Sequence, residues 1–538
     1  MAQRLKKLPT GIQTFSEIIE ENYLYVDKTP MLINLIECGK MYFYARPRRF
    51  GKSLSITTLE ALFLGRKDLF KGLYAEQWLN RSEFRPRPVI RLSMNEVTTD
   101  SGIAALKESM CLRVKDVADT LDVQLVESSL PADLFGDLIK KTFKKYQEKV
   151  VILIDEYDKP YIDFIDDTEM ANKVRETLAN FYVRVKANDE YTHFVFLTGI
   201  SKFAKMGVFS KLNNLTDISL RDDYAAMCGI TRDELLAYFP EHLEATAEKM
   251  NITKDELVDK MEDFYDGFSF NGKVKLYNPY STLQFFEEQS FDNYWFDSGT
   301  TNMMSRYLKN KDLTVEQFRN IPVTRDFIRN PGELDSAPPE GFLYQNGFLT
   351  LREGNTSDFN LDYPNKEVLN TMSRLLSRKF LQAKYDDLTT LVCIHLDNVN
   401  IKGLIKDFNM LLASIPYDDY SKALEQKVEI QGFTFPVQEW LYRSSILAFL
   451  RGCGLVVQAE MHTNRGRADL VLKHKGQIWI IELKVAYKGE SPAAKAEEAY
   501  NQIFEKNYDK PYQNPICLGL AIDDEKREIT EYKTKDSK

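Results

Sequence analysis

The 538-residue sequence contains no stretch long and apolar enough to cross a membrane. Its apolar runs fall well short of the roughly 20 consecutive residues that a transmembrane helix needs. The first residues, MAQRLKKLPTG, are charged and lack the apolar segment of a secretory signal. We therefore expect a cytoplasmic protein with no membrane partner.

Cysteines are few and widely spaced. The six of them never form a CxxC pair, which is the short spacing that zinc sites and many redox motifs require. Their scatter does not fit the disulfide framework of a small secreted domain either. The sequence therefore indicates reduced thiols and excludes a cysteine-bound zinc site as an explanation of function.

The chain also has no excess of positive charge. Its 71 basic residues are outnumbered by 80 acidic ones, which gives a net charge of −9. A protein that coats nucleic acid along its whole length needs an excess of positive charge. The net negative charge does not exclude one local basic groove. With 43% hydrophobic and 28% charged residues, the chain has ample material for the cores of several domains.

What the sequence does contain is a strand, a loop and a helix between Met41 and Leu64. The apolar run Met41–Ala45 predicts a buried strand, and the pattern after Ser53 predicts a helix. Strand, Gly-Lys-Ser and helix are the layout of a phosphate-binding P-loop, whose backbone N–H groups face the phosphates. Lys52 would contact the β- and γ-phosphates of ATP, and the hydroxyl of Ser53 would hold Mg²⁺. The expected phosphate-binding segment is Arg48, Arg49, Phe50, Gly51, Lys52, Ser53 and Leu54.

The match to the P-loop pattern is incomplete. The first glycine of the usual motif would fall at position 46, where this chain has arginine. The tripeptide Gly-Lys-Ser is also common by chance, so a second motif with complementary chemistry has to support it.

That second motif is a pair of acids at the end of a buried strand. Residues 150–154 are five consecutive aliphatic side chains, which suits a strand covered on both faces in a parallel sheet. Asp155 and Glu156 follow at its carboxyl end, where α/β folds bind their ligands. Asp155 would help to hold Mg²⁺ beside Ser53, and Glu156 would polarise the attacking water. The alternative is a buried strand that ends in a solvated acidic turn.

A further strand ends in polar residues as well. Residues 193–199 form an apolar run that ends near Thr198, and the chain continues to Ser201. A hydroxyl in this position can sense the γ-phosphate or place the water, although a plain strand-to-turn junction would also explain it. Strands alternate with helices over this half of the chain, which predicts an α/β fold with a parallel, helix-covered sheet.

A separate set of charged residues lies near the C-terminus. Asp469 falls in one predicted strand, and Glu482 and Lys484 fall in the next, after a turn at Gly476. Residues two apart in a strand share a face, so Glu482 and Lys484 would both point toward Asp469 across the hairpin. The two carboxylates would hold Mg²⁺, while Lys484 positions the water or stabilises the charge that develops on phosphate. This is the arrangement of a Mg²⁺-dependent nuclease.

Two further residues are candidates for the same catalytic site. Glu439 lies in a helix predicted before the hairpin, and Gln502 lies in a helix predicted after it. The alternative is an ordinary β-hairpin with exposed charges. The acids interrupt strongly apolar strands, however, and polar residues at core positions favour a functional site.

The rest of the sequence divides into regions of different character. Thr231 and Glu234 form a capping box at the start of a mainly helical region. Residues 330–366 are rich in proline, glycine and asparagine and include a hairpin predicted at 343–351. We expect four regions: a P-loop domain at 1–222, a helical lid at 223–330, a linker and helical region at 331–428, and a nuclease-like α/β domain at 429–538.

The N-terminal part resembles the bacterial AAA-ATPase-like family over roughly residues 5–300. The resemblance is carried by the P-loop, by the segments around Asp155 and Thr198, and by the motifs Tyr25-Val26-Asp27-Lys28-Thr29 and Tyr265-Asp266-Gly267-Phe268. The family itself carries arginine in place of the first P-loop glycine. The C-terminal part resembles a PD-(D/E)XK nuclease-superfamily domain, which has a restriction-endonuclease-like fold. Asp469, Glu482 and Lys484 match its core motif, with Ala468 where a proline is common.

The resemblance implies an ATPase joined to a nuclease-like module. One hypothesis is an enzyme that cleaves DNA with Mg²⁺ under the control of ATP. The other is a signalling or scaffold ATPase whose C-terminal domain binds nucleic acid or protein without cleavage, which the net negative charge favours. In a homo-oligomer a neighbouring subunit would supply an arginine to the ATPase site, and Arg175 and Arg184 are candidates.

Overall fold

The chain divides into two units in the computed structural model. The N-terminal unit comprises Met1–Thr300 and Asn320–Glu367, and the C-terminal unit comprises Thr301–Arg319 and Val368–Lys538. The finer division into four regions stays a prediction. None of the described helices is long and apolar enough to cross a membrane. The structure describes residues 5–99, 102–164, 167–200, 214–297, 304, 307, 315–329, 338–354, 358–381, 385–414, 427–430, 433–463 and 466–535.

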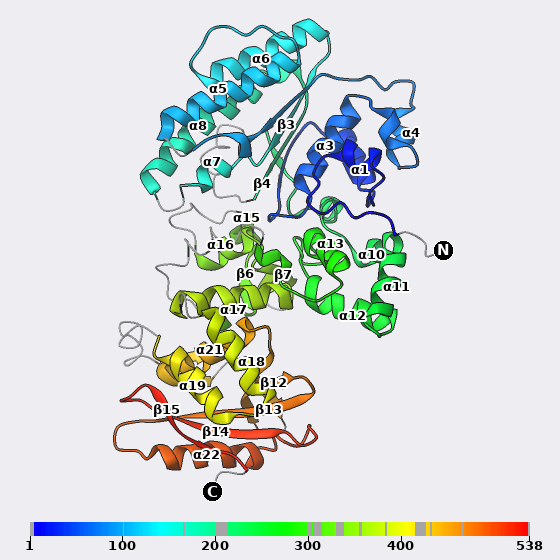
Figure 1. The fold of residues 1–538 in the computed structure, drawn as a ribbon. Helices are drawn as coiled ribbons and strands as arrows, with labels where there is room; N and C mark the ends of the chain where they lie inside the picture. The colour runs from blue at the N-terminus through cyan, green and yellow to red at the C-terminus, as the bar shows by residue number, and fades with distance from the viewer. Residues whose placement is uncertain are drawn as a thin grey trace. The chain divides into compact units, whose positions relative to one another are not determined.

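The N-terminal unit is built around a five-stranded parallel sheet (Figure 1). The strand order is β2–β3–β4–β1–β5, so β4 lies between the P-loop strand β1 and the acidic strand β3. Every residue of β1 and β3 is buried, as expected for parallel strands covered on both faces. The predicted α/β fold is confirmed. The strands are β1 (Met41–Ala45), β2 (Val89–Ser93), β3 (Val150–Asp155), β4 (Thr192–Gly199) and β5 (Thr216–Asp217).

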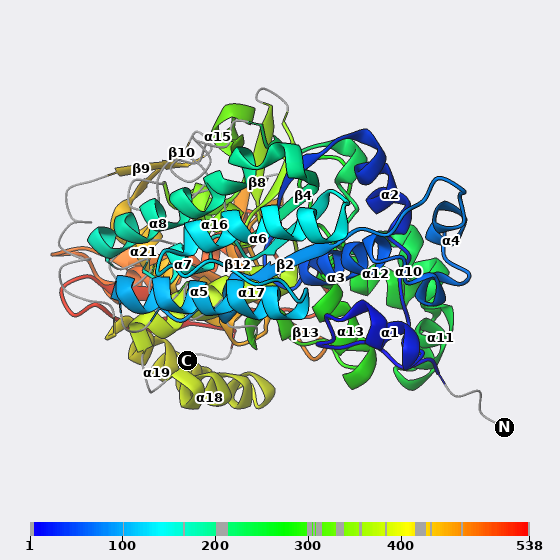
Figure 2. The same cartoon turned by 90° about the horizontal axis from the view of Figure 1, so that it is seen from above.

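Helices cover both faces of this sheet. The helices α5 (Gly102–Thr120), α6 (Pro131–Tyr146) and α8 (Thr168–Ala187) pack side by side on one face (Figures 1 and 2). The helices α3 (Lys52–Phe63) and α1 (Phe15–Glu20) lie on the other. With both faces covered, the carboxyl ends of the strands are where polar side chains can gather. The shorter helices here are α2 (Thr29–Cys38), α4 (Ala75–Leu79) and α7 (Lys159–Ile162).

The rest of the N-terminal unit consists of helices and a small antiparallel sheet. Thr231 forms the predicted capping box with Glu234, and Thr253 forms another with Glu256; each satisfies backbone N–H groups at the start of a helix. The helices are α10 (Arg232–Tyr238), α11 (Pro240–Lys249), α12 (Lys254–Tyr265), α13 (Pro279–Glu288), α15 (Arg325–Arg329) and α16 (Pro339–Gln345). The sheet has the order β6–β8–β7, with β6 (Ile321–Val323), β7 (Thr350–Glu353) and β8 (Phe359–Asp362).

The hairpin expected at residues 343–351 is wrong. Pro339 begins helix α16, which runs through Gln345, and the antiparallel pair is formed further along the chain by β7 and β8. Proline at the first helical position has a backbone angle already suited to the helix. By pattern alone the apolar residues Phe342, Leu343 and Tyr344 suit a strand as well as a helix, but here they belong to α16.

A buried carboxylic acid lies at the end of the N-terminal unit. Glu367, in the first turn of α17 (Lys366–Leu381), accepts a hydrogen bond from the N–H of Trp295 at 2.7 Å. Burial raises the pKa of Glu367 to about 8. The folded protein therefore keeps this proton at neutral pH, whereas the unfolded chain releases it near the ordinary pKa of glutamate.

We therefore expect the N-terminal unit to lose stability as the pH rises from 6 to 8. A carboxyl with a higher pKa in the folded state favours folding at low pH, and this contribution declines as the pH approaches the folded pKa. For Glu367, with a folded pKa of about 8, the loss over this window is on the order of 2 kcal/mol. Thermal unfolding of the wild type and of Glu367→Gln measures it. The glutamine is neutral throughout, so an equal pH dependence in both proteins would refute the prediction.

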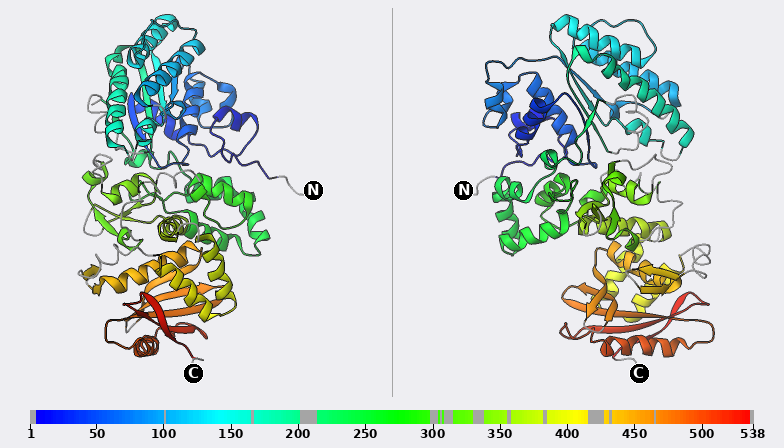
Figure 3. Two further views of the ribbon diagram at one scale, coloured as in Figure 1. Left: turned by 60° about the vertical axis from the view of Figure 1, so that its left-hand side comes forward. Right: turned by 180° about the vertical axis from the view of Figure 1, so that it is seen from behind.

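The C-terminal unit contains a second five-stranded sheet, of mixed orientation (Figure 3). Its order is β11–β12–β13–β14–β15; β13 and β14 are parallel, and the other neighbours are antiparallel. The strands are β11 (Val456–Thr463), β12 (Gly466–His474), β13 (Gln477–Ala486), β14 (Ile516–Asp523) and β15 (Glu528–Lys533). The other elements are α18 (Tyr385–Asp397), α19 (Ile401–Leu412), α21 (Val437–Gly452), α22 (Pro492–Glu505) and the hairpin β9 (Lys427–Ile430) with β10 (Phe433–Pro436).

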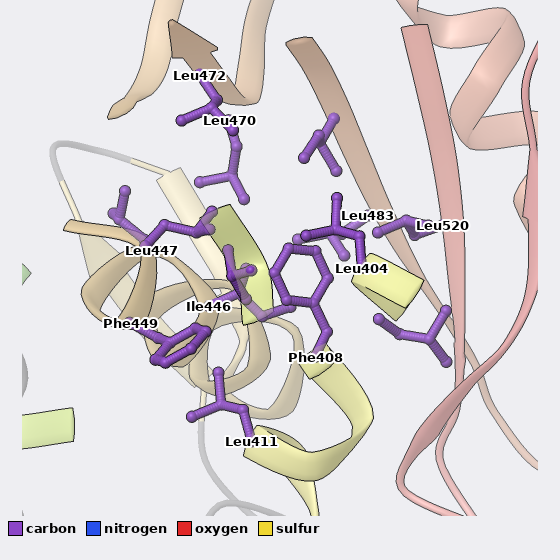
Figure 4. Close-up of a cluster of buried hydrophobic side chains, with 14 of the residues drawn as sticks. Leu404, Phe408, Leu411, Ile446, Leu447, Phe449, Leu470, Leu472, Leu483 and Leu520 are labelled. Carbon is purple, nitrogen blue, oxygen red and sulfur yellow. The ribbon is translucent and has the colours of Figure 1, made fainter. Parts of the chain in front are cut away.

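The main apolar core of this unit lies between one face of the sheet and the helices α19 and α21 (Figure 4). Leu483 of β13 belongs to this core, whereas Ile480 packs on the opposite face with Ile503 of α22. Successive strand residues point to opposite faces, so Glu482 shares the α22 face with Ile480. The core residues labelled in Figure 4 are Leu404, Phe408, Leu411, Ile446, Leu447, Phe449, Leu470, Leu472, Leu483 and Leu520.

Candidate active sites

The P-loop connects β1 to the first turn of α3. Gly51 precedes the helix with a φ of 92°, and Arg49 has a φ of 67°. Both are left-handed conformations, which glycine adopts most readily. Arg46 has no such conformation, so this loop does not require a glycine at the first position of the usual motif.

Arg46 is instead a buried part of the loop's framework. Only 1% of the residue is exposed, and its guanidinium lies 4.2 Å from the ring centre of Tyr44 and 4.1 Å from that of Phe270. It also donates a hydrogen bond to the carbonyl of Ser219 at 2.8 Å. These contacts compensate the buried charge and fix the start of the P-loop to the segment after β5.

Lys52 is buried at the point where the P-loop meets the acidic strand end. It is 6% exposed, and its Nζ donates to the carbonyls of Arg46 at 2.9 Å and Pro47 at 2.8 Å. Burial lowers the pKa of Lys52, and the charges of Glu156 and Asp155 oppose that change. The structure therefore brings the lysine and both acids within electrostatic reach of one another.

Asp155 and Thr198 meet at the ends of the adjacent strands β3 and β4. Thr198 Oγ1 donates to Asp155 Oδ1 at 2.5 Å, and the N–H of Glu156 donates to the same oxygen at 3.0 Å. Glu156 has a left-handed φ of 51°, and burial raises its pKa against the effect of Lys52. Ser201, predicted beside Thr198, lies outside the described residues.

Two P-loop side chains contact the helical part of the N-terminal unit. Phe50 packs edge-on against Phe268, with 4.9 Å between ring centres. The guanidinium of Arg49 lies 4.7 Å from the centre of the Tyr280 ring. The conformation of the loop therefore depends on residues well beyond the sheet.

The remaining predicted P-loop residues lie on either side of Lys52. Arg48 is half-buried, and its charge favours the ionised form of Glu156. Ser53 and Leu54 belong to the first turn of α3 and are both half-buried. The helix N-terminus carries unpaired N–H groups and a partial positive charge at this point, which suits an anionic ligand.

An apolar cavity of about 100 Å³ adjoins the P-loop. Its walls come from the segment before β1, from the P-loop with the start of α3, and from the helical region after residue 222. An apolar, concave wall beside a phosphate-binding loop suits a flat nucleotide base. The lining residues include Tyr25, Val26, Phe50, Leu54, Met227 and Ile230.

Lys28 joins two walls of this cavity. Its Nζ donates to both carboxylate oxygens of Glu234 at 2.6 Å and to the carbonyl of Ala226 at 2.9 Å. Glu234 is also the capping-box residue of α10 and accepts a hydrogen bond from the N–H of Thr231 at 2.8 Å. The segment Tyr25-Val26-Asp27-Lys28-Thr29 is thereby tied to the first helix of the region after residue 222.

The second predicted site is assembled on the neighbouring strands β12 and β13. The N–H of Asp469 donates to Glu482 Oε2 at 3.1 Å, and the N–H of Leu483 donates to Asp469 Oδ2 at 2.9 Å. Gln502 of α22 donates to Glu482 Oε1. Asp469, Glu482 and Gln502, which the sequence predicts for one site, are thus brought together by three different elements.

Glu439 and Lys484 face the same carboxylates. Burial raises the pKa of Glu439, the charge of Asp469 raises it further, and the charge of Lys484 opposes the rise. Lys484 is half-buried on β13, two residues after Glu482 and hence on the same strand face. The charge of Lys484 therefore favours the ionised form of all three acids, Glu439, Asp469 and Glu482.

The chemistry of this donor set fits a divalent cation. Burial raises the pKa of Asp469 and of Glu482, and the negative charge of Asp469 adds to the rise at Glu482. A bound cation would restore both negative charges. Within the described ranges no three His, Cys, Asp or Glu side chains are arranged to hold a metal by themselves. Mg²⁺ usually takes one or two carboxylates and keeps several waters, and Asp469 and Glu482 would supply two.

Sequence reasoning did not identify Arg443. This arginine lies on α21, and its Nη1 donates to Asp469 Oδ1 at 3.3 Å. It follows Glu439 by four residues, which places both on one face of the helix. That spacing was the signal that could have found it.

Gly519 allows α22 to approach the sheet at this site. It lies beside Glu482 in the pairing of β13 with β14. A Cβ added to Gly519 would lie 2.4 Å from the backbone nitrogen of Tyr500 and 2.5 Å from the carbonyl oxygen of Ala496, both in α22. Backbone atoms cannot yield as a side chain can, so only glycine fits here.

Gly519→Ala is therefore expected to destabilise the C-terminal unit by roughly 3 kcal/mol, since overpacking forces the backbones apart. The same shift would carry Gln502 away from Glu482. Denaturant-induced unfolding measures the loss. The control is Gly489→Ala, which adds a methyl group with no atom within 4 Å and should cost only the left-handed backbone strain of roughly 1 kcal/mol. Equal losses in the two variants would argue against a role for close packing.

Two family models and a relative match this chain. Residues 9–209 match the model described as "Predicted AAA-ATPase", and residues 437–532 match the PD-(D/E)XK nuclease superfamily. The "Uncharacterized protein in vnfD 5'region" of Azotobacter chroococcum mcd 1 is 33% identical over 537 residues, which cover 97% of this chain and 98% of the relative. The chain belongs to the AAA-ATPase-like family. It carries a PD-(D/E)XK nuclease-superfamily domain at its C-terminus.

Both matched segments contain the candidate sites described above. The AAA-ATPase-like segment includes the P-loop, Asp155 and Thr198, and the PD-(D/E)XK segment runs from before Glu439 to beyond Gln502. The family resemblance expected from the sequence is confirmed. The match to the relative covers nearly all of both chains, so it is not confined to either of the two segments that the family models match.

Proposed function

We propose that this AAA-ATPase-like protein binds and hydrolyses ATP in its N-terminal unit and cleaves DNA with Mg²⁺ in its PD-(D/E)XK domain. The observation that carries the proposal is the direct link between Asp469 and Glu482, with Lys484 on the same strand face. Lys52 beside Asp155 and Glu156 supports the ATPase part in the same way.

The N-terminal site would bind the phosphates, the base and the Mg²⁺ of ATP through different groups. The backbone of the P-loop and the first turn of α3 would bind the phosphates, with the ammonium of Lys52 on the β- and γ-phosphates. The apolar cavity beside Phe50 would take the base. The hydroxyl of Ser53 and the carboxylate of Asp155 would hold the Mg²⁺ that accompanies the nucleotide.

Glu156 is the residue best suited to orient the attacking water. Its pKa is raised by burial, and a raised pKa makes a carboxylate a better proton acceptor at neutral pH. The charges of Lys52 and Arg48 oppose this rise, because they favour the ionised form. Thr198 holds the neighbouring Asp155 through its hydroxyl, which leaves the two acids with separate tasks.

The C-terminal site divides its tasks in a similar manner. Asp469 and Glu482 would hold Mg²⁺, with Glu439 near enough to interact electrostatically with both. A divalent cation in such a site neutralises phosphate charge and makes a bound water more acidic. Lys484 would orient the attacking water or stabilise the charge on the phosphate, and Gln502 keeps the Glu482 carboxylate in place.

The test is cleavage of linear, circular and single-stranded DNA by the full chain, with Mg²⁺ or Mn²⁺ and with or without ATP. Lys484→Ala serves as the inactive control. Cleavage that requires Lys484 and changes with ATP supports the coupled activity. Cleavage that ignores ATP supports the nuclease alone. Absence of cleavage in every condition would reject the nuclease and favour an ATPase whose C-terminal domain binds nucleic acid or protein without cutting.

A further inference from the structure

A buried arginine contacts the carboxylate pair of the C-terminal site. The side chains of Arg443 and Asp469 are 9% and 12% exposed, and the nitrogen and oxygen that join them are 3.3 Å apart. Burying both charges costs free energy that their attraction only partly offsets. An arginine kept in such a position therefore needs an explanation.

The four carboxylate oxygens of Asp469 and Glu482 accept hydrogen bonds of different kinds. Asp469 Oδ2 accepts from the backbone of Leu483, and Glu482 Oε2 accepts from the backbone of Asp469. Glu482 Oε1 accepts from the amide of Gln502. Asp469 Oδ1 accepts from the guanidinium of Arg443. Of these donors from the described part of the chain, Arg443 is the charged one.

The charge balance of the site also suggests that Arg443 compensates part of its negative charge. On β12, β13 and α21, Asp469, Glu482 and Glu439 contribute three negative charges when ionised, and Arg443 and Lys484 contribute two positive charges. Lys495 of α22 also acts on Glu439, but its charge is paired with the surface acids Glu490 and Glu498. The set is thus one positive charge short of neutrality. Without Arg443 it would be two short, which is the charge of a divalent cation. A cation that binds while Arg443 is present also meets the repulsion of the guanidinium.

We propose that Arg443 is a resident counter-ion of the carboxylate site. It holds Asp469 in position while no divalent cation is bound, and it gives up Asp469 Oδ1 when one binds. Arg443 is thus a positioning residue that acts through Asp469 and lowers the affinity of the site for metal. The inference rests on the proposed Mg²⁺-dependent function of the same site.

The test is a titration of the full chain with Mn²⁺ in the absence of nucleotide, with free Mn²⁺ followed by electron paramagnetic resonance. The binding lost in Glu482→Gln defines the C-terminal site. At that site Arg443→Met should bind Mn²⁺ about tenfold tighter, because a nearby like charge commonly shifts an ionic equilibrium by a power of ten or more. Tenfold corresponds to about 1.4 kcal/mol.

Two variants separate charge from structure. Arg451→Met removes the same charge from the same helix, eight residues or about 12 Å further along; Arg451 is buried and donates to the carbonyl of Val457 at 3.3 Å. This variant should bind Mn²⁺ like the wild type. Arg443→Lys keeps the positive charge, and its affinity for Mn²⁺ should stay within about threefold of the wild type. The positive charge opposes the metal, and the planar shape of the guanidinium is not needed for that.

Each outcome decides the matter. Tighter binding in Arg443→Met alone supports the proposal, as does a lower melting temperature of that variant in EDTA that Mn²⁺ restores. Unchanged or weaker binding in Arg443→Met overturns it, and so does equal tightening in Arg443→Lys or Arg451→Met. If Arg443→Met does not fold, tightening in Arg443→Lys still overturns it, and wild-type affinity there supports it. If the wild type shows no Mn²⁺ binding that Glu482→Gln loses, the proposed metal-dependent function fails first and the role of Arg443 falls with it.

Discussion

Substitution of Lys52 by alanine is expected to lower ATP hydrolysis by roughly 100- to 1,000-fold, the usual effect of removing one preorganised charge from a reacting phosphate or oxyanion. The structure explains why no neighbour can replace it. Lys52 is buried, and its ammonium group is fixed by the carbonyls of Arg46 and Pro47 at the start of the loop. Of the neighbouring cations, Arg46 is already engaged with Tyr44, Phe270 and Ser219, and Arg49 lies against the ring of Tyr280.

ATP binding should be lost along with hydrolysis in the Lys52 variant. Phosphate release measures the hydrolysis rate, and the fluorescence of a labelled ATP analogue measures binding. Glu156→Gln is the informative companion, because it removes only the group expected to orient water. It should lose hydrolysis and keep nucleotide binding. Hydrolysis at the wild-type rate in Lys52→Ala would mean that the ATPase activity does not use this P-loop.

The parts of the N-terminal fold that sequence reasoning predicted share a local cause. Residues 150–154 are aliphatic without interruption, and a run of this kind has few alternatives to a strand buried on both faces. The capping box at Thr231 is equally local, because threonine and glutamate three residues apart satisfy each other's backbone groups. The wrong prediction of a hairpin at residues 343–351 has a local cause as well. Pro339 begins a helix there, and the apolar pattern alone does not distinguish that helix from a strand.

The role of Arg46 could not be predicted, because its partners are distant in the sequence. Its guanidinium rests on Phe270 and bonds Ser219, residues more than a hundred positions further along the chain. The same holds for the apolar cavity, whose walls combine Tyr25, Leu54 and Ile230. Motif spacing identifies the residues of a loop, but it carries no information about which remote side chains will close around it.

The C-terminal site was predictable only in part: some of its features follow from local sequence, and others depend on distant residues. The period of a strand was enough to predict that Glu482 and Lys484 share a face, and the face they share is the one that α22 covers. The close approach of that helix depends on Gly519, a position where nothing in the sequence alone singles out the glycine. Arg443 follows Glu439 by four residues, so helical periodicity places both on one face of α21, but the sequence does not show that this face meets Asp469 of β12.

Glu482→Gln is expected to abolish DNA cleavage by the PD-(D/E)XK domain while the domain stays folded. The loss should be roughly 1,000-fold or more, because the change removes one of the two charges that would hold the cation as well as the field it creates at the phosphate. Glutamine has nearly the same shape, and its carbonyl oxygen can still accept from the N–H of Asp469. Gln502 can turn its amide to accept from the new NH₂ group, so the packing of α22 should survive.

Cleavage of a labelled duplex in Mg²⁺ measures this effect, and circular dichroism with thermal unfolding checks the fold. Glu498→Gln is the matched control, because Glu498 lies on α22, is 54% exposed and pairs with Lys495 at the surface; exposed pairs of this kind contribute about 0–1 kcal/mol. The control should cleave like the wild type. A Glu482→Gln protein that still cleaves would place the metal-binding carboxylates elsewhere. A wild type that never cleaves, with the Asp469–Glu482 pair intact, would instead make this pair the binding centre of a domain that holds its ligand without cutting it.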